Sequence, residues 1–255
     1  MARLDVSPSA ITALDLTEKC AKMVKTSREP AMSYSAATVP ARETTQAALI
    51  FRLIVFALAA FYAVRMVVAN PLIEEPFGPF RWLTYWANLA ALACAWFMLG
   101  RSRGTHVRRH DGLVSATAVV GAMVVYLYWS LYFDDPLSVN SEQPGPAWTE
   151  YYYHLAGPLL QWIDALFILR AFRAPLRAVG WLVGLIAAWL TFIELAVQPL
   201  NDTPAGSVTS GLPYPFLNNM TLDERLPFYA MNIAVALGLL VVFSLLAFAI
   251  RRLMR

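Results

Sequence analysis

The chain has 255 residues, of which 58% are hydrophobic and only 15% are charged. A soluble globular domain carries about 25% charged residues, so the composition excludes an ordinary soluble domain and indicates an integral membrane protein. The mean hydropathy of +0.52 agrees with that class. The formal net charge of +3 is too small to suggest nucleic-acid binding, and we expect no nucleic-acid partner.

The first 46 residues are polar and contain no apolar run of the length that a signal peptide needs. Their second half, "SREPAMSYSAATVPARETT", has the composition of a loop. The sequence therefore predicts two parts: a disordered cytoplasmic leader over residues 1–46 and a transmembrane domain over residues 47–255.

Apolar segments fill the rest of the chain. Each is long enough to cross a hydrocarbon core of about 30 Å, which takes roughly 20 helical residues. None shows the strict alternation of a barrel strand. We therefore predict an all-α, polytopic membrane protein with six transmembrane helices, near residues 48–69, 80–100, 113–133, 151–172, 178–198 and 227–250.

The basic residues predict the orientation. Of the 20 Lys and Arg residues, 16 lie in the leader, the loop 101–112, the turn 170–177 and the C-terminal tail, which this topology places on one side. The opposite loops hold only Arg81 and Arg225. The positive-inside rule then puts both termini in the cytoplasm. We expect an integral protein of the plasma (inner) membrane.

Three short motifs have structural interpretations. "LPYPFL", residues 212–217, lies in a long outer connection and could form either a lid over the outer mouth or an interfacial anchor. "GWLVG", Gly180 to Gly184, indicates close helix packing. Cys20 and Cys94 offer no disulfide framework, and a packing role is expected for each.

Two of the three histidines, His106 and His110, lie in the basic loop. Their i,i+4 spacing could bind a metal ion, but a solvated loop is the preferred interpretation. We therefore predict no metal site and no cofactor.

Strongly polar residues gather in the outer third of the predicted membrane domain. Such residues are costly in hydrocarbon and mark functional sites or interhelical contacts. Within single helices their four-residue spacing places them on one face. The layer comprises Arg65, Thr84, Asn88, Trp129, Ser130, His154, Thr191, Glu194, Gln198 and Asn232.

Depth within the bilayer suggests which of these polar residues meet. Arg65 and Glu194 lie at similar depth, so we expect them to neutralise each other, as an ion pair or around a polar head group. Asp164 lies about 15 Å deeper than His154 and is rotated from it by roughly 80°. It is therefore expected to form a buried hydrogen bond to another helix rather than to contact the histidine.

Thr84 and His154 carry the chemistry in this layer. A hydroxyl and an imidazole in a shielded pocket are the minimum for nucleophilic acyl transfer, because the base removes the proton and the oxygen attacks. Asn88, Asn232 or Arg65 could stabilise an oxyanion. The alternative for His154 is a hydrogen bond to an interfacial loop.

Two segments carry a family resemblance. "FRWLTYWANLAALACAW", Phe80 to Trp96, and "YYYHLAGPLLQWIDALF", which includes His154, resemble the androgen-induced-gene and androgen-dependent TFPI-regulating protein family. The resemblance covers roughly residues 48–250. It implies a multi-pass membrane threonine hydrolase that cleaves fatty-acid esters of hydroxy fatty acids. Thr84 would be its nucleophile and His154 its base.

The leading hypothesis is an intramembrane lipid esterase that takes a membrane lipid or acyl ester from the outer leaflet. Asn88, Arg65, Glu194 and Asn232 would contact the substrate or its oxyanion. The alternative is a non-catalytic integral membrane protein, either a small-molecule carrier or a lipid-binding scaffold. The sequence makes no prediction about the oligomeric state.

Overall fold

The computed structural model describes residues 38–73, 76–136 and 146–254. From Val39 onward the described residues belong to one compact unit. They are almost entirely helical, and within these ranges the only β-type pairing is a single bridge between Ala205 and Ser210. The predicted all-α class is confirmed.

Five helical runs have the length and hydropathy needed to cross a membrane. They coincide with five of the six predicted spans, because the apolar stretches that favour membrane insertion also form uninterrupted helices. In chain order they are α2 (Gln46–Ala69), α3 (Leu83–Ser102), α4 (Asp111–Asp134), the run of α7 (Pro175–Phe192) with η6 (Ile193–Val197) and α8 (Gln198–Leu200), and α10 (Leu222–Leu253).

The remaining predicted span, 151–172, corresponds to a continuous but irregular helical run. It consists of α5 (Ala147–Tyr151), a π-helical turn η4 (Tyr152–Ala156), α6 (Gly157–Ile163) and a second π-helical turn η5 (Asp164–Ile168). Such π turns widen a helix locally and are often found at functional sites. A sixth membrane crossing by this run stays a prediction.

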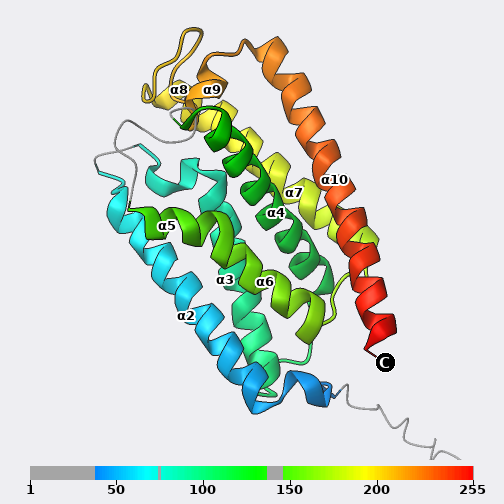
Figure 1. Cartoon of the computed structure of the whole chain (residues 1–255). Helices are drawn as coiled ribbons and strands as arrows, with labels where there is room; N and C mark the ends of the chain where they lie inside the picture. The colour runs from blue at the N-terminus through cyan, green and yellow to red at the C-terminus, as the bar shows by residue number, and fades with distance from the viewer. Residues whose placement is uncertain (1–37, 74–75, 137–145, 255) are drawn as a thin grey trace, which may run out of the picture. The chain divides into compact units, whose positions relative to one another are not determined.

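Helix α4 forms the centre of the bundle, packed against α3, α6, α7 and α10 (Figure 1). It is the most buried of the five apolar helices, with 72% of its most apolar stretch covered by protein. Small side chains allow this close packing. A Cβ atom at Gly121 would lie 3.3 Å from Pro158 of α6, so this glycine is what allows α4 and α6 to approach each other.

The GxxxG motif does not pack against the described chain. A Cβ atom added at Gly180 or Gly184 would meet nothing within 4 Å, so the predicted close helix packing is wrong within this unit. The physical reason is the rotation of α7, which buries Ala178, Leu182 and Trp189 on its other face.

The loop over residues 201–221 folds back on the bundle and contains α9 (Pro215–Asn218). Its anchor is Asn218, whose side chain accepts from the backbone N–H of Leu212 at 3.1 Å and donates to the carbonyls of Leu212 and Pro204, each at 2.9 Å. Leu212 and Leu217 are almost completely buried, against a cluster that includes Trp189 and Tyr229. This burial supports the lid interpretation of "LPYPFL".

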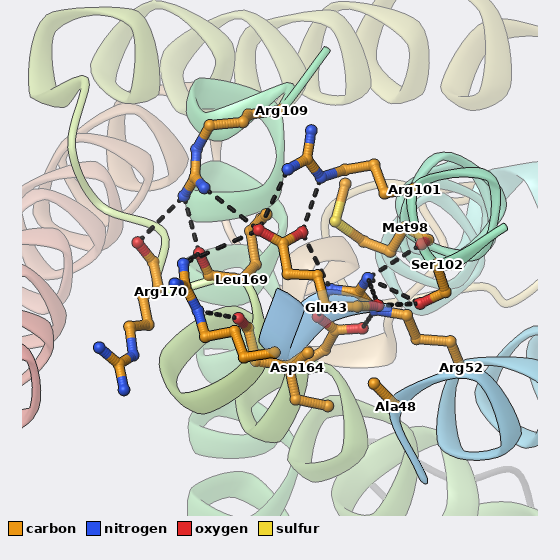
Figure 2. Close-up of polar contacts among 12 residues, drawn as sticks. Glu43, Ala48, Arg52, Met98, Arg101, Ser102, Arg109, Asp164, Leu169 and Arg170 are labelled. Atoms are coloured by element: carbon orange, nitrogen blue, oxygen red, sulfur yellow. Dashed lines mark hydrogen bonds and ion pairs between the residues drawn. The ribbon is translucent and has the colours of Figure 1, made fainter. Parts of the chain in front are cut away.

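At the opposite end of the bundle, charged residues form a buried network that we call the Glu43 cluster: Glu43, Arg52, Arg101, Arg109 and Asp164 (Figure 2). The short 3-10 helix η1 (Ala41–Glu43) brings the fully buried Glu43 carboxylate to Arg101, at 2.7 Å and 3.1 Å. Most of the predicted leader, residues 1–37, lies outside the described residues. Glu43 belongs to the last part of that leader, so the packed part of the chain begins before the predicted boundary at residue 46.

Asp164 forms the buried interhelical bond that its depth predicts. Its two carboxylate oxygens accept from Arg52 at 2.7 Å and 2.8 Å, a bidentate arrangement. Arg52 also donates to the Met98 carbonyl at 3.1 Å and to the Ser102 hydroxyl at 3.0 Å. Asp164 therefore ties the irregular helix to α2 and has no contact with His154.

The Arg52–Asp164 pair yields a stability prediction. Arg52→Met removes one partner from a buried pair, and the uncompensated carboxylate should cost about 3–5 kcal/mol of unfolding free energy. The double variant Arg52→Met/Asp164→Leu should recover most of that loss, because no buried charge is then left alone. Thermal unfolding in detergent measures both effects. An Arg52→Met protein as stable as the wild type would show that Arg52 and Asp164 do not form a buried ion pair.

The orientation is tested by labelling. Val208, 51% exposed in the 201–221 loop, should react as Val208→Cys with a membrane-impermeant maleimide in intact cells. Thr105→Cys, in the basic loop, should react only after permeabilisation. Cys20→Ser serves as the background, since Cys94 is buried. The reverse pattern would show that the predicted orientation is wrong.

Candidate active site

Thr84 and His154 meet inside the bundle, as their shared depth predicts. Thr84 is the second residue of α3, and His154 lies in the π turn η4. The Thr84 Oγ1 and His154 Nε2 atoms are 3.3 Å apart, and both side chains are buried. This is a long hydrogen bond, within the range that catalytic pairs show before a substrate tightens the site. The predicted proximity is confirmed.

The second ring nitrogen of His154 faces Glu150. The Nδ1 atom lies 3.1 Å from the Glu150 carbonyl oxygen and 3.3 Å from its carboxylate Oε2. Two acceptors at this position favour the tautomer with its proton on Nδ1, which leaves the Nε2 lone pair directed at Thr84. Thr84, His154 and Glu150 thus have the order of contacts that a nucleophile, a base and an acid have in a catalytic triad.

Sequence reasoning missed Glu150 as a member of the site. The predicted span starts at residue 151 and leaves Glu150 outside the helix, whereas Glu150 lies in α5, one helical turn before His154. The i,i+4 spacing of the two residues was the available signal, because it places them on one helix face.

Pro158 helps to hold the histidine backbone. A proline has no N–H, so Pro158 cannot donate to the carbonyl of His154, four residues earlier. The indole Nε1 of Trp129 in α4 donates to that carbonyl at 2.8 Å. The neighbouring Tyr128 stacks on the imidazole, with ring centroids 3.6 Å apart and the planes 5° from parallel. Helix α4 therefore fixes both the position and the plane of the His154 ring.

Tyr214 reaches the site from the 201–221 loop. Leu83, Thr84 and Tyr214 line the same cavity, and the backbone N–H of Leu83 and the hydroxyl of Thr84 lie close enough to the Tyr214 phenol to lower its pKa. Leu83 is the first residue of α3, so its N–H has no acceptor within the helix. Burial raises the pKa of Tyr214 to about 12, although these two donors oppose the shift. The phenol is therefore protonated at neutral pH and can donate a hydrogen bond.

The pair opens onto a cavity of about 550 Å³, a size typical of small-molecule sites. The residues of α4, α7 and α10 that line it are largely apolar, and polar residues lie toward the end of α2 and in the 201–221 loop. The apolar wall consists of Val120, Met123, Val124, Leu127, Ile186, Leu190 and Ile233.

Of the four predicted accessory residues, Arg65 and Asn232 line this cavity. The Arg65 guanidinium lies over the Trp148 ring, 4.6 Å from its centroid. Asn232 donates to the carbonyl of Phe228 at 2.9 Å. Asn88 instead lines a narrow cavity of about 40 Å³ that continues from Thr84 toward Asp164, and it donates to a carbonyl of α2 at 3.2 Å.

Glu194 is paired with Arg225, so the predicted pairing of Arg65 with Glu194 is wrong. The two Arg225 nitrogens lie 3.0 Å and 3.2 Å from the carboxylate oxygens, and the Tyr229 hydroxyl donates at 2.6 Å. Equal depth did not imply proximity, because Arg65 belongs to α2 and Glu194 to the run that follows α7. These helices lie on different sides of α3 and α4 (Figure 1).

The two loop histidines are less solvated than predicted. Their Nε2 atoms are 2.8 Å apart, and both rings stack on Phe97. Burial lowers the pKa of His110, as do the nearby His106, Arg108 and Arg101. Within residues 38–73, 76–136 and 146–254 no group of three or more His, Cys, Asp or Glu residues is placed to hold a metal ion.

Comparison with known proteins identifies the family. The FAR-17a/AIG1-like protein family matches residues 47–247 of the chain, the part that also carries the resemblance found in the sequence. Searches of curated proteins and of solved structures gave no match. Together with the apolar helices, the family match identifies an integral membrane protein. The chain belongs to the FAR-17a/AIG1-like protein family.

Proposed function

We propose that the chain is an intramembrane carboxylic-ester hydrolase, with Thr84 as nucleophile and His154 as general base. The observation that carries this proposal is the contact between the Thr84 hydroxyl and His154 Nε2 at the wall of a largely apolar cavity. Membership of the FAR-17a/AIG1-like family supports it.

In the first half-reaction His154 accepts the Thr84 proton while Oγ1 attacks the ester carbonyl carbon. The negative charge that develops on the carbonyl oxygen needs donors within about 3 Å. Tyr214 can supply one, since it lines the same cavity as Thr84 and its phenol is close enough for the Thr84 hydroxyl to affect its pKa. The backbone N–H of Thr84, in the first turn of α3, is a second candidate because it has no intrahelical acceptor.

The tetrahedral intermediate then collapses. His154 returns the proton to the leaving alkoxide, the C–O bond breaks, and an alcohol departs from the acyl-threonine. Water attacks that ester with His154 again as base, and a carboxylic acid leaves as Thr84 regains its proton. Glu150 holds the imidazole in the required tautomer and stabilises its protonated form.

The cavity suits an ester with at least one fatty chain. Its α4, α7 and α10 walls offer apolar contact to an acyl chain, and Arg65 lies toward a polar end that suits the rest of the molecule. Fatty-acid esters of hydroxy fatty acids, the substrates implied by the sequence resemblance, fit this description. In the predicted orientation the substrate comes from the outer leaflet.

The accessory residues take different parts in this proposal. Arg65 and Asn232 line the cavity and are the proposed substrate contacts. Asn88 and Glu194 are assigned to holding helices together, through the carbonyl of Ala59 and through Arg225. The same cavity would also suit a non-catalytic lipid carrier or scaffold, which the following experiment distinguishes.

Thr84→Ala and His154→Ala should each lower ester hydrolysis by at least about 10³-fold, because they remove the attacking oxygen or the base. Thr84→Ser should retain activity, since it keeps the oxygen. The double variant should be hardly slower than either single one, because the two groups act as a unit. Hydrolysis of a labelled fatty-acid ester by purified protein measures these rates.

Thr191→Ala is the matched control, because Thr191 is exposed on α7 away from the cavity. Each variant is first shown to unfold at the wild-type temperature. If folded Thr84→Ala hydrolyses esters at the wild-type rate, the hydrolase proposal fails and the carrier or scaffold takes its place.

Tyr214→Phe tests the oxyanion donor. Removal of one such donor typically costs about 10²–10³-fold in kcat, so kcat should fall by that order while KM changes little. The control is Tyr126→Phe, since Tyr126 is 52% exposed on α4. A KM increase without a loss of kcat would assign Tyr214 to substrate binding instead.

A further inference from the structure

A third hollow lies at the end of the bundle that contains the Glu43 cluster. It has a volume of about 320 Å³, and its lining residues come from the C-terminal end of α10 and from the turn between η5 and α7. Figure 1 shows these two segments next to each other. Four of the five residues that line the hollow are arginines, and the set is Arg170, Arg173, Phe248, Arg251 and Arg252. The proposed reaction uses none of them.

Hydrogen bonds to backbone carbonyls hold three of these arginines in place, and the Arg252 guanidinium lies over the Phe248 ring, 5.0 Å from its centroid. Arg251 donates to the carbonyl of Ala171 at 2.7 Å, and Arg170 donates to that of Met254 at 3.2 Å. The two bonds link the turn to α10 in both directions. Arg173 donates to the carbonyl of Arg170 at 3.1 Å. The guanidinium groups are therefore positioned before any ligand arrives, which lowers the entropic cost of binding.

The positive charge of the hollow is not balanced locally. Among the described residues no Asp or Glu forms an ion pair with any of the four arginines. Asp111 lies close by, but its oxygens accept from the backbone N–H groups of Arg173 and Ala174 and from Arg109. Four like charges in one hollow repel one another and attract an anion.

Arg170 adds a second observation. Its Nε atom is buried and has no hydrogen-bond partner within the described chain. Figure 2 shows its side chain directed away from the Glu43 cluster, although its carbonyl accepts from Arg109 at 3.2 Å. A buried donor without an acceptor is costly, so an acceptor from a ligand would stabilise this arrangement.

The guanidinium groups of the hollow and the apolar residues beside it indicate which class of ligand would bind there. Guanidinium groups recognise phosphate through paired hydrogen bonds, better than an ammonium group does. An apolar stripe also leads away from the hollow along α10, formed by the exposed Phe248, Leu245 and Val241 at helical spacing. A ligand that fills both features has a phosphate head and fatty chains.

We propose that this hollow binds the phosphate of an anionic phospholipid, with the acyl chains lying along α10. Basic pockets at the cytoplasmic ends of membrane helices suit such lipids, because the cytoplasmic leaflet carries negative charge. The predicted orientation places the hollow in that leaflet. The lipid would fasten the end of α10 to the turn before α7. This inference does not depend on the esterase activity.

The test compares lipids on the purified full chain in detergent. Dioleoyl phosphatidylglycerol should raise the unfolding temperature and stay bound in native mass spectrometry, whereas dioleoyl phosphatidylcholine should do neither. Inorganic phosphate and glycerol 3-phosphate distinguish a soluble ligand from a lipid. Displacement of the phosphatidylglycerol by millimolar phosphate would overturn the lipid assignment.

The test variants change only the two arginines of the hollow whose side chains form no hydrogen bond between α10 and the turn. Arg173→Gln/Arg252→Gln removes two charges and leaves the Arg251–Ala171 and Arg170–Met254 bonds intact. It should weaken phosphatidylglycerol binding at least about tenfold. Arg103→Gln/Arg108→Gln, two exposed arginines of the basic loop, is the charge-matched control and should change binding less than about twofold.

Two results would overturn the proposal. Equal binding of phosphatidylglycerol and phosphatidylcholine would show that the hollow does not select a negative charge. An equal loss of binding in both double variants would show that the lipid responds to the overall surface charge instead of to this site. Since both variants carry the same net charge, a difference between them reports on the hollow itself.

Discussion

The proposed function depends on one structural constraint, the fixed position of the His154 imidazole next to Thr84. His154 lies in an irregular helix, where a proline four residues later cannot donate to its carbonyl. Trp129 donates to that carbonyl and Tyr128 stacks on the ring, so contacts from helix α4 hold the imidazole in place. Within an apolar bundle a free carbonyl is costly, and the contacts that satisfy it also direct Nε2 toward Thr84.

The polar residues at the two ends of the bundle differ in their surroundings. At one end, Thr84, His154 and Tyr214 line the large cavity, and the carboxylate of Glu150 lies behind the histidine. At the other, Glu43 and Asp164 are each matched to arginines. Pairing makes buried charges tolerable without making them reactive. A charge in the membrane domain was thus a poor guide to the site, and an uncharged hydroxyl beside a histidine was a better one.

Hydropathy predicted the helices because the apolar runs that favour them are local features of the chain. The Thr84–His154 contact was predictable because depth and helix direction confined both residues to one layer. Depth alone could not say which helices are neighbours, so Glu194 was paired with Arg65 instead of Arg225. The GxxxG motif failed for a similar reason, since helix rotation is set by the whole core. Tyr214 reaches the site only through the fold of a long loop, which no periodic pattern describes.

The central claim is that Thr84 is a nucleophile activated by His154, and covalent labelling tests it most directly. The purified protein is treated with an alkyl fluorophosphonate, and the modified residue is located by peptide mass spectrometry. The account predicts one adduct, on Thr84, that forms at the wild-type rate in Thr191→Ala and is lost in His154→Ala. An adduct on a different side chain of the folded protein, or labelling of Thr84 that persists in His154→Ala, would contradict it.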